Sequence, residues 1–215
     1  MKGAASIETS GAKVLIVTDP MCSWCWGMTP EVDRARTLMP EAFDVLLGGI
    51  NVHGTQPIGE FGRDHLMGIW REVHATTGQS FGFKLPTPLV YNSTLPCIAV
   101  QAVREVLGEP PFDYLHELQQ RFFVDGVDIN NLEALAETAV GLGVGRDAFL
   151  LAAGSEKVRA EVRFQMNTSR DFGTNALPSV LREAGGERRL LAGGYLDAEA
   201  LLGFAEQSVE SSGKG

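Results

Sequence analysis

The spacing of hydrophobic residues changes along the first part of the chain in the order strand, helix, strand. Lys13–Thr18 is a short run of apolar and β-branched residues that ends at an Asp-Pro turn, as a buried strand does. Apolar residues then recur at helical spacing as far as Pro40, and Phe43–Val52 forms a second apolar run. Inside the expected helix, Pro30 removes the backbone N–H that would bond to Trp26. Together these segments predict a βαβ unit with parallel strands and a right-handed crossover.

From residue 53 to residue 170 the pattern predicts only helices. A loop rich in glycine and proline covers residues 78–92, and Ser93 or Thr94 is placed to cap the helix that follows it. On that helix Cys97 lies opposite the apolar stripe, so the pattern does not mark it as a core residue. The apolar residues of the expected helices fall within residues 58–73, 95–106, 115–122, 132–142 and 158–169.

Strand character returns near the C-terminal end. Pro178–Arg182 and Arg188–Ala192 flank Gly185-Gly186, which suits the tight turn of an antiparallel hairpin. A closing helix is expected to begin with Asp197 as its N-cap. The predicted fold class is therefore α/β, in which a βαβ half and a ββα half are separated by an all-helical insertion domain. The three parts cover residues 13–52, 53–170 and 171–208.

Composition and charge narrow the class of protein. The chain has 215 residues, of which 44% are hydrophobic, and this is enough for a sizeable core. Acidic residues outnumber basic residues by 27 to 18, and the net charge of −9 argues against nucleic acid and anionic membranes as partners. No apolar window approaches a membrane span, and the N-terminal segment lacks the apolar region of a secretory signal. We therefore expect a cytoplasmic protein, whose oligomeric state the sequence leaves open.

The strongest chemical signal is the pair Cys22 and Cys25 at the junction between the first strand and the first helix. Unpaired N–H groups at a helix N-terminus favour an anion, here the thiolate of Cys22, which is the nucleophilic form. Cys25 is placed to attack any mixed disulfide that Cys22 forms. Such a redox-active Cys22–Cys25 disulfide needs no bound cofactor, only an external reductant such as glutathione.

The same two thiols are also half of a zinc site. A structural zinc site needs four ligands, usually with a second close pair. The third cysteine, Cys97, stands alone, and the four histidines do not form a close pair. We therefore expect no metal. A soft-metal-binding protein that uses Cys22, Cys25 and Cys97 as thiolate ligands remains an alternative.

The order of elements, with C-x-x-C at the first strand-to-helix junction, resembles the DsbA-like disulfide oxidoreductases, in which a helical domain splits a thioredoxin fold. Two segments carry this resemblance. Residues 19–27, DPMCSWCWG, are similar to the signature of the cytosolic, signal-less FrnE-like branch, which includes predicted protein-disulfide isomerases. Residues 171–178, DFGTNALP, resemble the segment that opens the third core strand, although Thr174 and Ala176 stand where Val and Gly are usual.

The resemblance implies a thiol–disulfide oxidoreductase that acts on protein or small-molecule thiols and disulfides, in a direction that the sequence leaves open. Pro178 would be a cis-proline that faces the cysteines, and the backbone of Leu177 would pair with an extended substrate segment. Trp24, between the two cysteines, would contact substrate. A glutathione-dependent isomerase or kappa-class-like transferase has a similar architecture. Those proteins typically carry serine at the nucleophile position, and the presence of both cysteines argues against that alternative.

Two further residues have two interpretations each. Asp19 either relays a proton to Cys25 as a general base or only shapes the Asp-Pro turn. Cys97 is either an auxiliary thiol near the site or a small, inert residue at a contact between domains.

Overall fold

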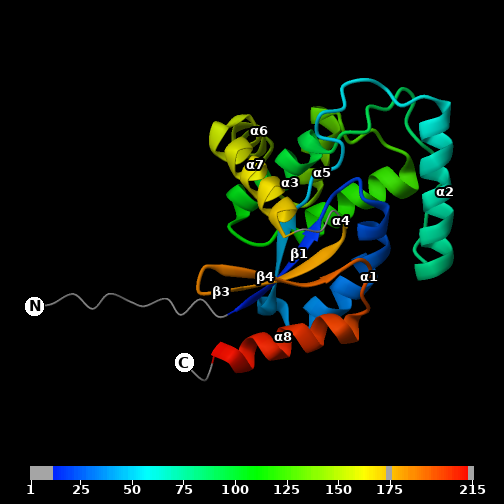
Figure 1. Cartoon of the computed structure of the whole chain (residues 1–215). Helices are drawn as coiled ribbons and strands as arrows, with labels where there is room; N and C mark the ends of the chain where they lie inside the picture. Colours follow the sequence, from blue (N-terminus) through cyan, green and yellow to red (C-terminus); the bar gives the residue numbers. More distant parts are fainter. Residues whose placement is uncertain (1–11, 173–175, 213–215) are drawn as a thin grey trace, which may run out of the picture.

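A mixed four-stranded sheet lies at the centre of the computed structural model, which describes residues 12–172 and 176–212 (Figure 1). Its strands lie in the order β2-β1-β3-β4. β1 pairs with β2 in parallel, whereas β1 with β3 and β3 with β4 are antiparallel. The predicted βαβ unit and the predicted hairpin are therefore confirmed. The strands are β1 (Lys13–Thr18), β2 (Phe43–Leu47), β3 (Ser179–Ala184) and β4 (Glu187–Gly193).

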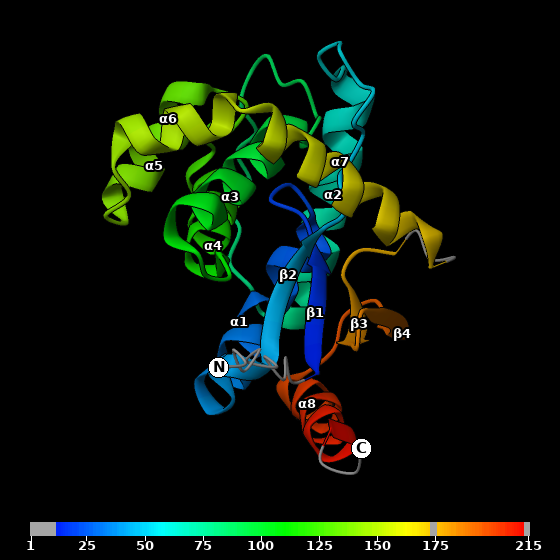
Figure 2. The ribbon, with the colours of Figure 1, turned by 90° about the vertical axis from the view of Figure 1, so that its left-hand side faces the viewer.

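Both faces of the sheet are covered. Val14 and Ile16 of β1 face the main core, which they share with α1 (Ser23–Leu38) and α8 (Ala198–Ser212). The alternate residues of the same strand face a smaller apolar cluster on the other side of the sheet. Figure 2, seen from the side, shows α8 at the lower end of the sheet, opposite the helices that precede β3. Because water reaches neither face, the strand is a continuous apolar run instead of an alternating one.

A series of helices separates β2 from β3, and the fold is that of a thioredoxin domain interrupted by a helical insertion. The hydrophobic core runs from the sheet into these helices without a break. The division at residues 53 and 170 into separate domains therefore stays a prediction. In the described part of this stretch the helices are α2 (Glu60–Thr77), α3 (Thr94–Leu107), α4 (Phe112–Gln120), the π-helix η2 (Arg121–Asp125), α5 (Leu132–Gly141), α6 (Arg146–Gly154) and α7 (Glu156–Asp171).

Two predictions about these elements are wrong. β2 ends at Leu47 and not at Val52, because the chain turns at Gly49 and Asn51, whose φ angles of 78° and 46° do not fit a strand. Helix α6 was not expected at all. It is short, rich in alanine and bounded by glycine, so its few apolar residues give no clear helical period.

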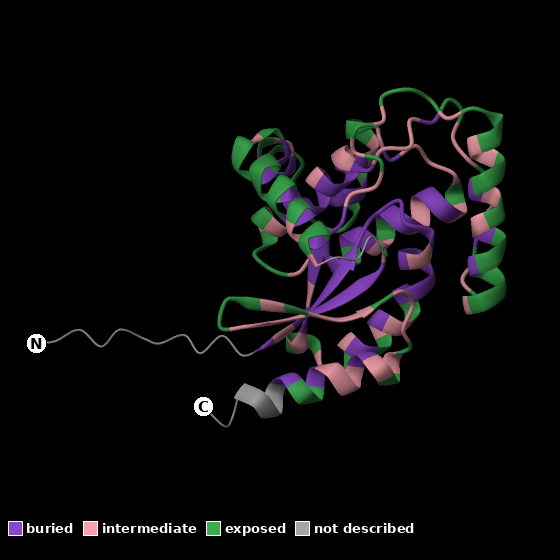
Figure 3. Ribbon diagram, in the orientation of Figure 1, coloured by how far each residue is buried: buried purple, intermediate pink, exposed green. Residues whose placement is uncertain are grey.

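The pattern of exposure agrees with this layout. Figure 3 shows β1 buried beyond its first residue, while the outer side of α2 and the tip of the β3–β4 hairpin are exposed. The hairpin turns at Gly185 and Gly186, whose φ angles of 59° and 81° match the turn that joins two tightly paired strands. None of the helices in the described residues is both long and apolar enough to cross a membrane.

Candidate active site

Cys22 stands at the N-cap of α1, immediately after the turn that follows β1. Its sulfur accepts a hydrogen bond from the backbone N–H of Cys25 at 3.2 Å. Its own N–H donates to the carbonyl oxygen of Asp19 at 3.2 Å, which closes the turn. The Cys22 sulfur therefore lies at the positive end of the helix dipole, where a thiolate is favoured. Cys22 and Cys25 are both free thiols here.

The loop before β3 brings a second segment to the same place. The peptide bond between Leu177 and Pro178 is cis, and the Leu177 carbonyl oxygen lies 3.6 Å from the Cys22 sulfur. The Leu177 side chain turns away and packs on Gly48, where an added Cβ would lie 2.6 Å from it. A backbone group, and not the Leu177 side chain, thus faces the Cys22 sulfur. Residues 173–175 of the family-like segment, Thr174 among them, lie outside the described residues.

Cys25 differs from Cys22 in its surroundings. Burial raises the pKa of the Cys25 thiol well above its ordinary value, and the neighbouring Cys22 and Asp19 raise it further. A hydrogen bond with Thr18 lowers it by a smaller amount. Cys25 is therefore protonated at neutral pH, and a base must take its proton before it can attack a disulfide.

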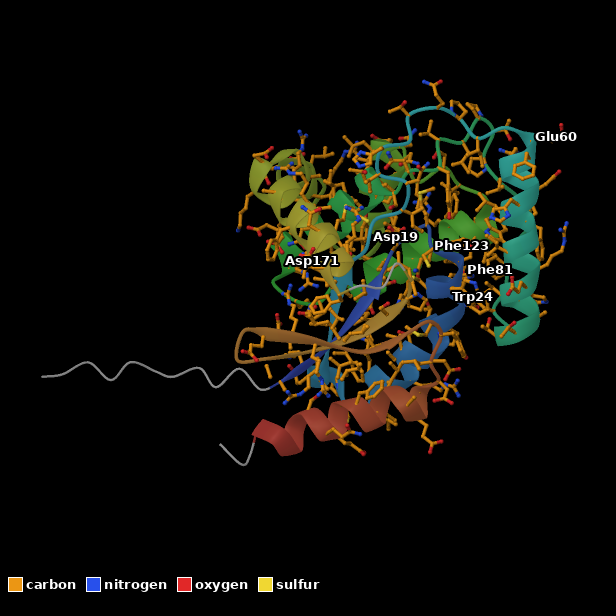
Figure 4. All side chains as sticks on the ribbon, in the orientation of Figure 1. Asp19, Trp24, Glu60, Phe81, Phe123 and Asp171 are labelled. Atoms are coloured by element: carbon orange, nitrogen blue, oxygen red, sulfur yellow. The ribbon has the colours of Figure 1, made fainter. Side chains whose placement is uncertain are left out.

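Asp19 is fully buried between β1 and the insertion (Figure 4). One carboxylate oxygen accepts from the Met21 N–H at 2.7 Å, and the other accepts from the Ser93 hydroxyl at 2.5 Å. Burial raises the pKa of Asp19 to about 6, although these hydrogen bonds lower it. The Met21 bond fits the turn-shaping interpretation, and the raised pKa fits the general-base interpretation, so both stay predictions.

The expectation that Cys97 lies outside the core is wrong. Cys97 is fully buried, and its sulfur lies 3.6 Å from a carboxylate oxygen of Asp19. Helix α3 packs against α4, α5, α6 and α7, so that even its polar side, including Gln101, is buried. Burial and the nearby charge of Asp19 raise the pKa of the Cys97 thiol well above its ordinary value. Cys97 therefore sits at the contact between insertion and sheet as a protonated thiol.

The insertion supplies three site residues that the sequence did not reveal. Ser93 was expected only as a helix cap, yet its side chain makes no capping bond. The Tyr91 hydroxyl donates to the Met21 carbonyl at 2.7 Å, and the Gln119 amide donates to the Asp19 carbonyl at 3.1 Å. Gln119 did leave a signal, because a polar residue one turn after Leu115 falls on the apolar face of α4. Tyr91, inside an irregular loop, left none.

The two tryptophans of the motif have separate environments. Trp24 is half-buried between the cysteines (Figure 4). Trp26 is buried, stacks on Phe123 with a centroid distance of 6.2 Å, and donates from its ring nitrogen to the Ser80 carbonyl at 2.8 Å. Trp26 therefore fixes α1 against the insertion, while Trp24 stays beside the reactive pair.

The site's donor set does not resemble a metal centre. Within the described residues, no three side chains of the kinds His, Cys, Asp and Glu gather as a metal ion would require.

A family model described as a DSBA-like thioredoxin domain matches residues 13–201. The chain belongs to the DSBA-like thioredoxin domain family. Membership places it among the thiol–disulfide oxidoreductases at the level of the family. A search of curated protein sequences returns no match.

Several solved structures have a similar fold. A candidate protein disulfide isomerase from Nitrosomonas europaea is 27% identical, with a TM-score of 0.84 over 94% of this chain and 98% of that one. The cytosolic disulfide reductase DsbM from Pseudomonas aeruginosa is 25% identical, with a TM-score of 0.72 over 93% and 96%. DsbM has also been solved with GSH. A 2-hydroxychromene-2-carboxylate isomerase, at 13% identity and a TM-score of 0.58 over 92% of this chain and 94% of that one, shares the fold alone.

Proposed function

We propose that this member of the DSBA-like family exchanges disulfides through Cys22 as nucleophile and Cys25 as resolving thiol. The observation that carries the proposal is the position of the Cys22 sulfur. It lies at the N-cap of α1, within 3.6 Å of the Leu177 carbonyl, with the Cys25 N–H bonded to it at 3.2 Å. A helix N-terminus stabilises a thiolate, and the Leu177 backbone borders the space beside it.

Reduction of a substrate then has two steps. The Cys22 thiolate attacks one substrate sulfur, and the other substrate sulfur leaves as a thiolate. The Cys25 sulfur next attacks the Cys22 sulfur, which releases the second substrate thiol and leaves a Cys22–Cys25 disulfide. Two electrons pass to the substrate, and the reverse sequence oxidises a dithiol.

The proton of Cys25 goes to Asp19 in this proposal. The Asp19 charge raises the pKa of the Cys25 thiol, although by less than burial and Cys22 do, so the two groups lie within electrostatic reach of each other. With its own pKa raised to about 6, the Asp19 carboxyl is ionised at neutral pH and still basic enough to accept a proton.

The substrate segment lies beside Leu177 and Pro178. We infer that an extended peptide pairs with the Leu177 backbone, in the manner of an added strand. Trp24, half-buried between the cysteines, offers an apolar wall for the substrate side chains. Protein disulfides fit this arrangement.

Glutathione is the reductant that we propose for the Cys22–Cys25 disulfide, and the cytoplasm is the proposed compartment. The related DsbM is named as a cytosolic disulfide reductase and has been solved with GSH. A cavity of about 160 Å³ adjoins Leu177 and is lined in part by Arg170, a cation that suits the carboxylates of glutathione. No resident cofactor is needed for the exchange.

Trapping of the intermediate tests this function. A Cys25→Ser variant cannot resolve the first step, so it should accumulate mixed disulfides with glutathione disulfide or a scrambled ribonuclease. Non-reducing gels and mass spectrometry should locate them at Cys22. The Cys22→Ser variant is the control and should form none.

An absence of mixed disulfides in Cys25→Ser, together with a wild type inactive toward insulin, would contradict the proposal. Activity that survives Cys22→Ala would favour the glutathione-dependent isomerase or transferase. Stoichiometric metal in protein purified under reducing conditions would favour a metal-binding role for the thiols.

A further inference from the structure

The buried carboxyl of Asp19 is held by the helical insertion as well as by its own turn. Two side chains of the segment that begins α3 contact the same carboxylate oxygen. The Ser93 hydroxyl donates to it at 2.5 Å, and the Cys97 thiol lies 3.6 Å from it. All three residues are fully buried, so water does not compete for these contacts.

Ser93 makes this contact with Asp19 instead of capping its own helix, α3. It occupies the N-cap position of α3 but makes no side-chain capping bond. Ser155, at the N-cap of α7, does make the usual bond and accepts from the Val158 N–H at 3.2 Å. The Ser93 oxygen instead accepts from the Ile50 N–H at 2.7 Å. For its single hydrogen the Asp19 carboxylate, at 2.5 Å, is a much nearer acceptor than the Ile50 carbonyl, at 3.4 Å.

We propose that Ser93 and Cys97 are positioning residues that set the proton affinity of Asp19, and thereby the pH range in which Cys25 resolves mixed disulfides. This inference rests on the proposed function, in which Asp19 accepts the Cys25 proton. It assigns to the insertion a part in the chemistry beyond its packing role.

The physical basis is the balance between burial and hydrogen bonding. Burial favours the neutral acid, whereas each donor to the carboxylate favours the charged form. The donors that act on Asp19 are the side chains of Ser93 and Cys97 and the backbone N–H groups of Met21 and Gly49. Of the two side chains, the hydroxyl is the stronger donor and the thiol the weaker. Removal of either one therefore shifts Asp19 toward its protonated form.

Other titratable groups face the same region and do not reverse this expectation. Cys25 and Tyr91 respond to the charge of Asp19, and burial raises the pKa of each well above its ordinary value. Both therefore stay protonated at the pH values where Asp19 titrates. A pH dependence of the Cys25 step around pH 6 thus reports on Asp19.

Stopped-flow mixing of the reduced protein with dithiobis(nitrobenzoate) separates the Cys22 step from the Cys25 step. The first thionitrobenzoate released reports the attack by Cys22, and the second reports the resolution by Cys25. The rate of the second release should rise with pH around a midpoint near 6 in the wild type, where the buried Asp19 titrates.

In the Ser93→Ala variant this midpoint should move upward by about one pH unit, a tenfold change in proton affinity. In Cys97→Ala it should move in the same direction by a smaller amount. Ser155→Ala is the matched control: it loses a real helix cap but no contact with Asp19, and its midpoint should equal that of the wild type. The first release should keep its rate in all three variants.

An unchanged midpoint in either variant removes that residue from the proposal, and an unchanged midpoint in both overturns it. A shift of equal size in Ser155→Ala would also overturn the proposal, because the midpoint would then depend on the stability of the protein and not on contact with Asp19. If Ser93→Ala does not fold, the midpoint of Cys97→Ala decides whether the proposal holds. A wild type with no second release would instead contradict the proposed function itself.

Discussion

The side chain of Asp19 joins two parts of the molecule that are far apart in sequence. It bonds to Met21 in its own turn and to Ser93 at the start of α3. Its pKa rises from 3.8 to about 6 because burial outweighs these bonds. A carboxyl group with such a pKa costs stability once it ionises, and the proposed function uses this carboxyl as a base.

This cost leads to a prediction for Asp19→Asn. Since the folded-state pKa lies above the unfolded-state value, the contribution of Asp19 to stability is complete below pH 3.8 and is lost as the pH rises through about 6. Asparagine cannot ionise and escapes this loss. Between about pH 4 and pH 8 the free energy of unfolding of the variant should therefore rise by about 2 kcal/mol relative to that of the wild type.

Urea unfolding of both proteins across this pH range measures that change. The comparison uses the change with pH and not the absolute difference, because the altered hydrogen bonds add a nearly constant offset. A difference that is the same at both pH values would show that Asp19 does not titrate in this range. The second thionitrobenzoate release should also slow in Asp19→Asn at neutral pH.

Among single residues, the sequence predicted those features that depend on neighbouring positions along the chain. Cys22 and Cys25 were found from their spacing and their place before a helix, and the cis bond at Pro178 was expected from the resemblance. Ser93 was assigned to a cap because sequence shows a residue's neighbours along the chain, whereas its true partner, Asp19, is 74 positions away. The burial of Cys97 was not predicted, for the same reason.

At the scale of elements, α1 depends on the loop after α2. Pro30 lies inside α1 and offers no N–H to the Trp26 carbonyl. The side-chain amide of Gln79 donates to that carbonyl instead, at 3.0 Å. The helix that carries the cysteines is thus completed by a residue of the insertion.

A double-mutant cycle measures this dependence. Gln79→Ala leaves the Trp26 carbonyl without its donor and should reduce the free energy of unfolding by about 1 to 3 kcal/mol. In a Pro30→Ala background the new N–H can bond to the same carbonyl, so Gln79→Ala should cost clearly less. Equal costs in the two backgrounds would mean that Gln79 does not replace the missing helical bond.

The loop after α2 also packs against the π-helix η2. Gly82 donates its N–H to the Phe123 carbonyl at 2.9 Å, and a Cβ at this position would lie 1.9 Å from the Val124 carbonyl oxygen. Only glycine fits here, and the close approach keeps Phe81 and Phe123 in contact in the aromatic cluster of the insertion.

Gly82→Ala should therefore reduce the free energy of unfolding by about 2 kcal/mol or more, because the loop must move away from η2. Gly68, inside α2, has open space around its Cβ position, and Gly68→Ala should stabilise the protein by about 0.5 to 1 kcal/mol. Thermal and urea unfolding compare the two variants. A Gly82→Ala protein as stable as the wild type would show that this approach is not close in solution.

The types of the secondary-structure elements were more predictable from the sequence than their boundaries. The four strands and most helices follow from apolar periodicity, because their burial patterns are regular. β2 was given five residues too many, since the apolar run continues beyond Leu47 while the backbone turns at Gly49. Helix α6 was missed because tertiary packing of Phe149 and two alanines, and not a local pattern, determines it.

At the scale of the whole molecule, the insertion also protects the edge of the sheet. β2 is an edge strand, and two of its backbone groups are bonded by side chains from the insertion. Arg104 of α3 donates to the Val45 carbonyl at 2.8 Å, and Gln165 of α7 accepts from the Leu47 N–H at 3.1 Å. These contacts block strand pairing with another chain and fix α3, the helix that carries Cys97, over the active site.

We propose that Cys22 and Cys25 form one reversible two-electron pair. Equilibration of the protein in buffers of graded glutathione and glutathione disulfide, followed by alkylation and mass spectrometry, tests it most directly. Trp24 and Trp26 should report the same transition by fluorescence. We expect a single transition to a Cys22–Cys25 disulfide, which depends on the square of the glutathione concentration. The transition should persist in Cys97→Ala and disappear in Cys22→Ala. Two free thiols at every ratio, or a product in which only Cys97 is oxidised, would contradict the claim.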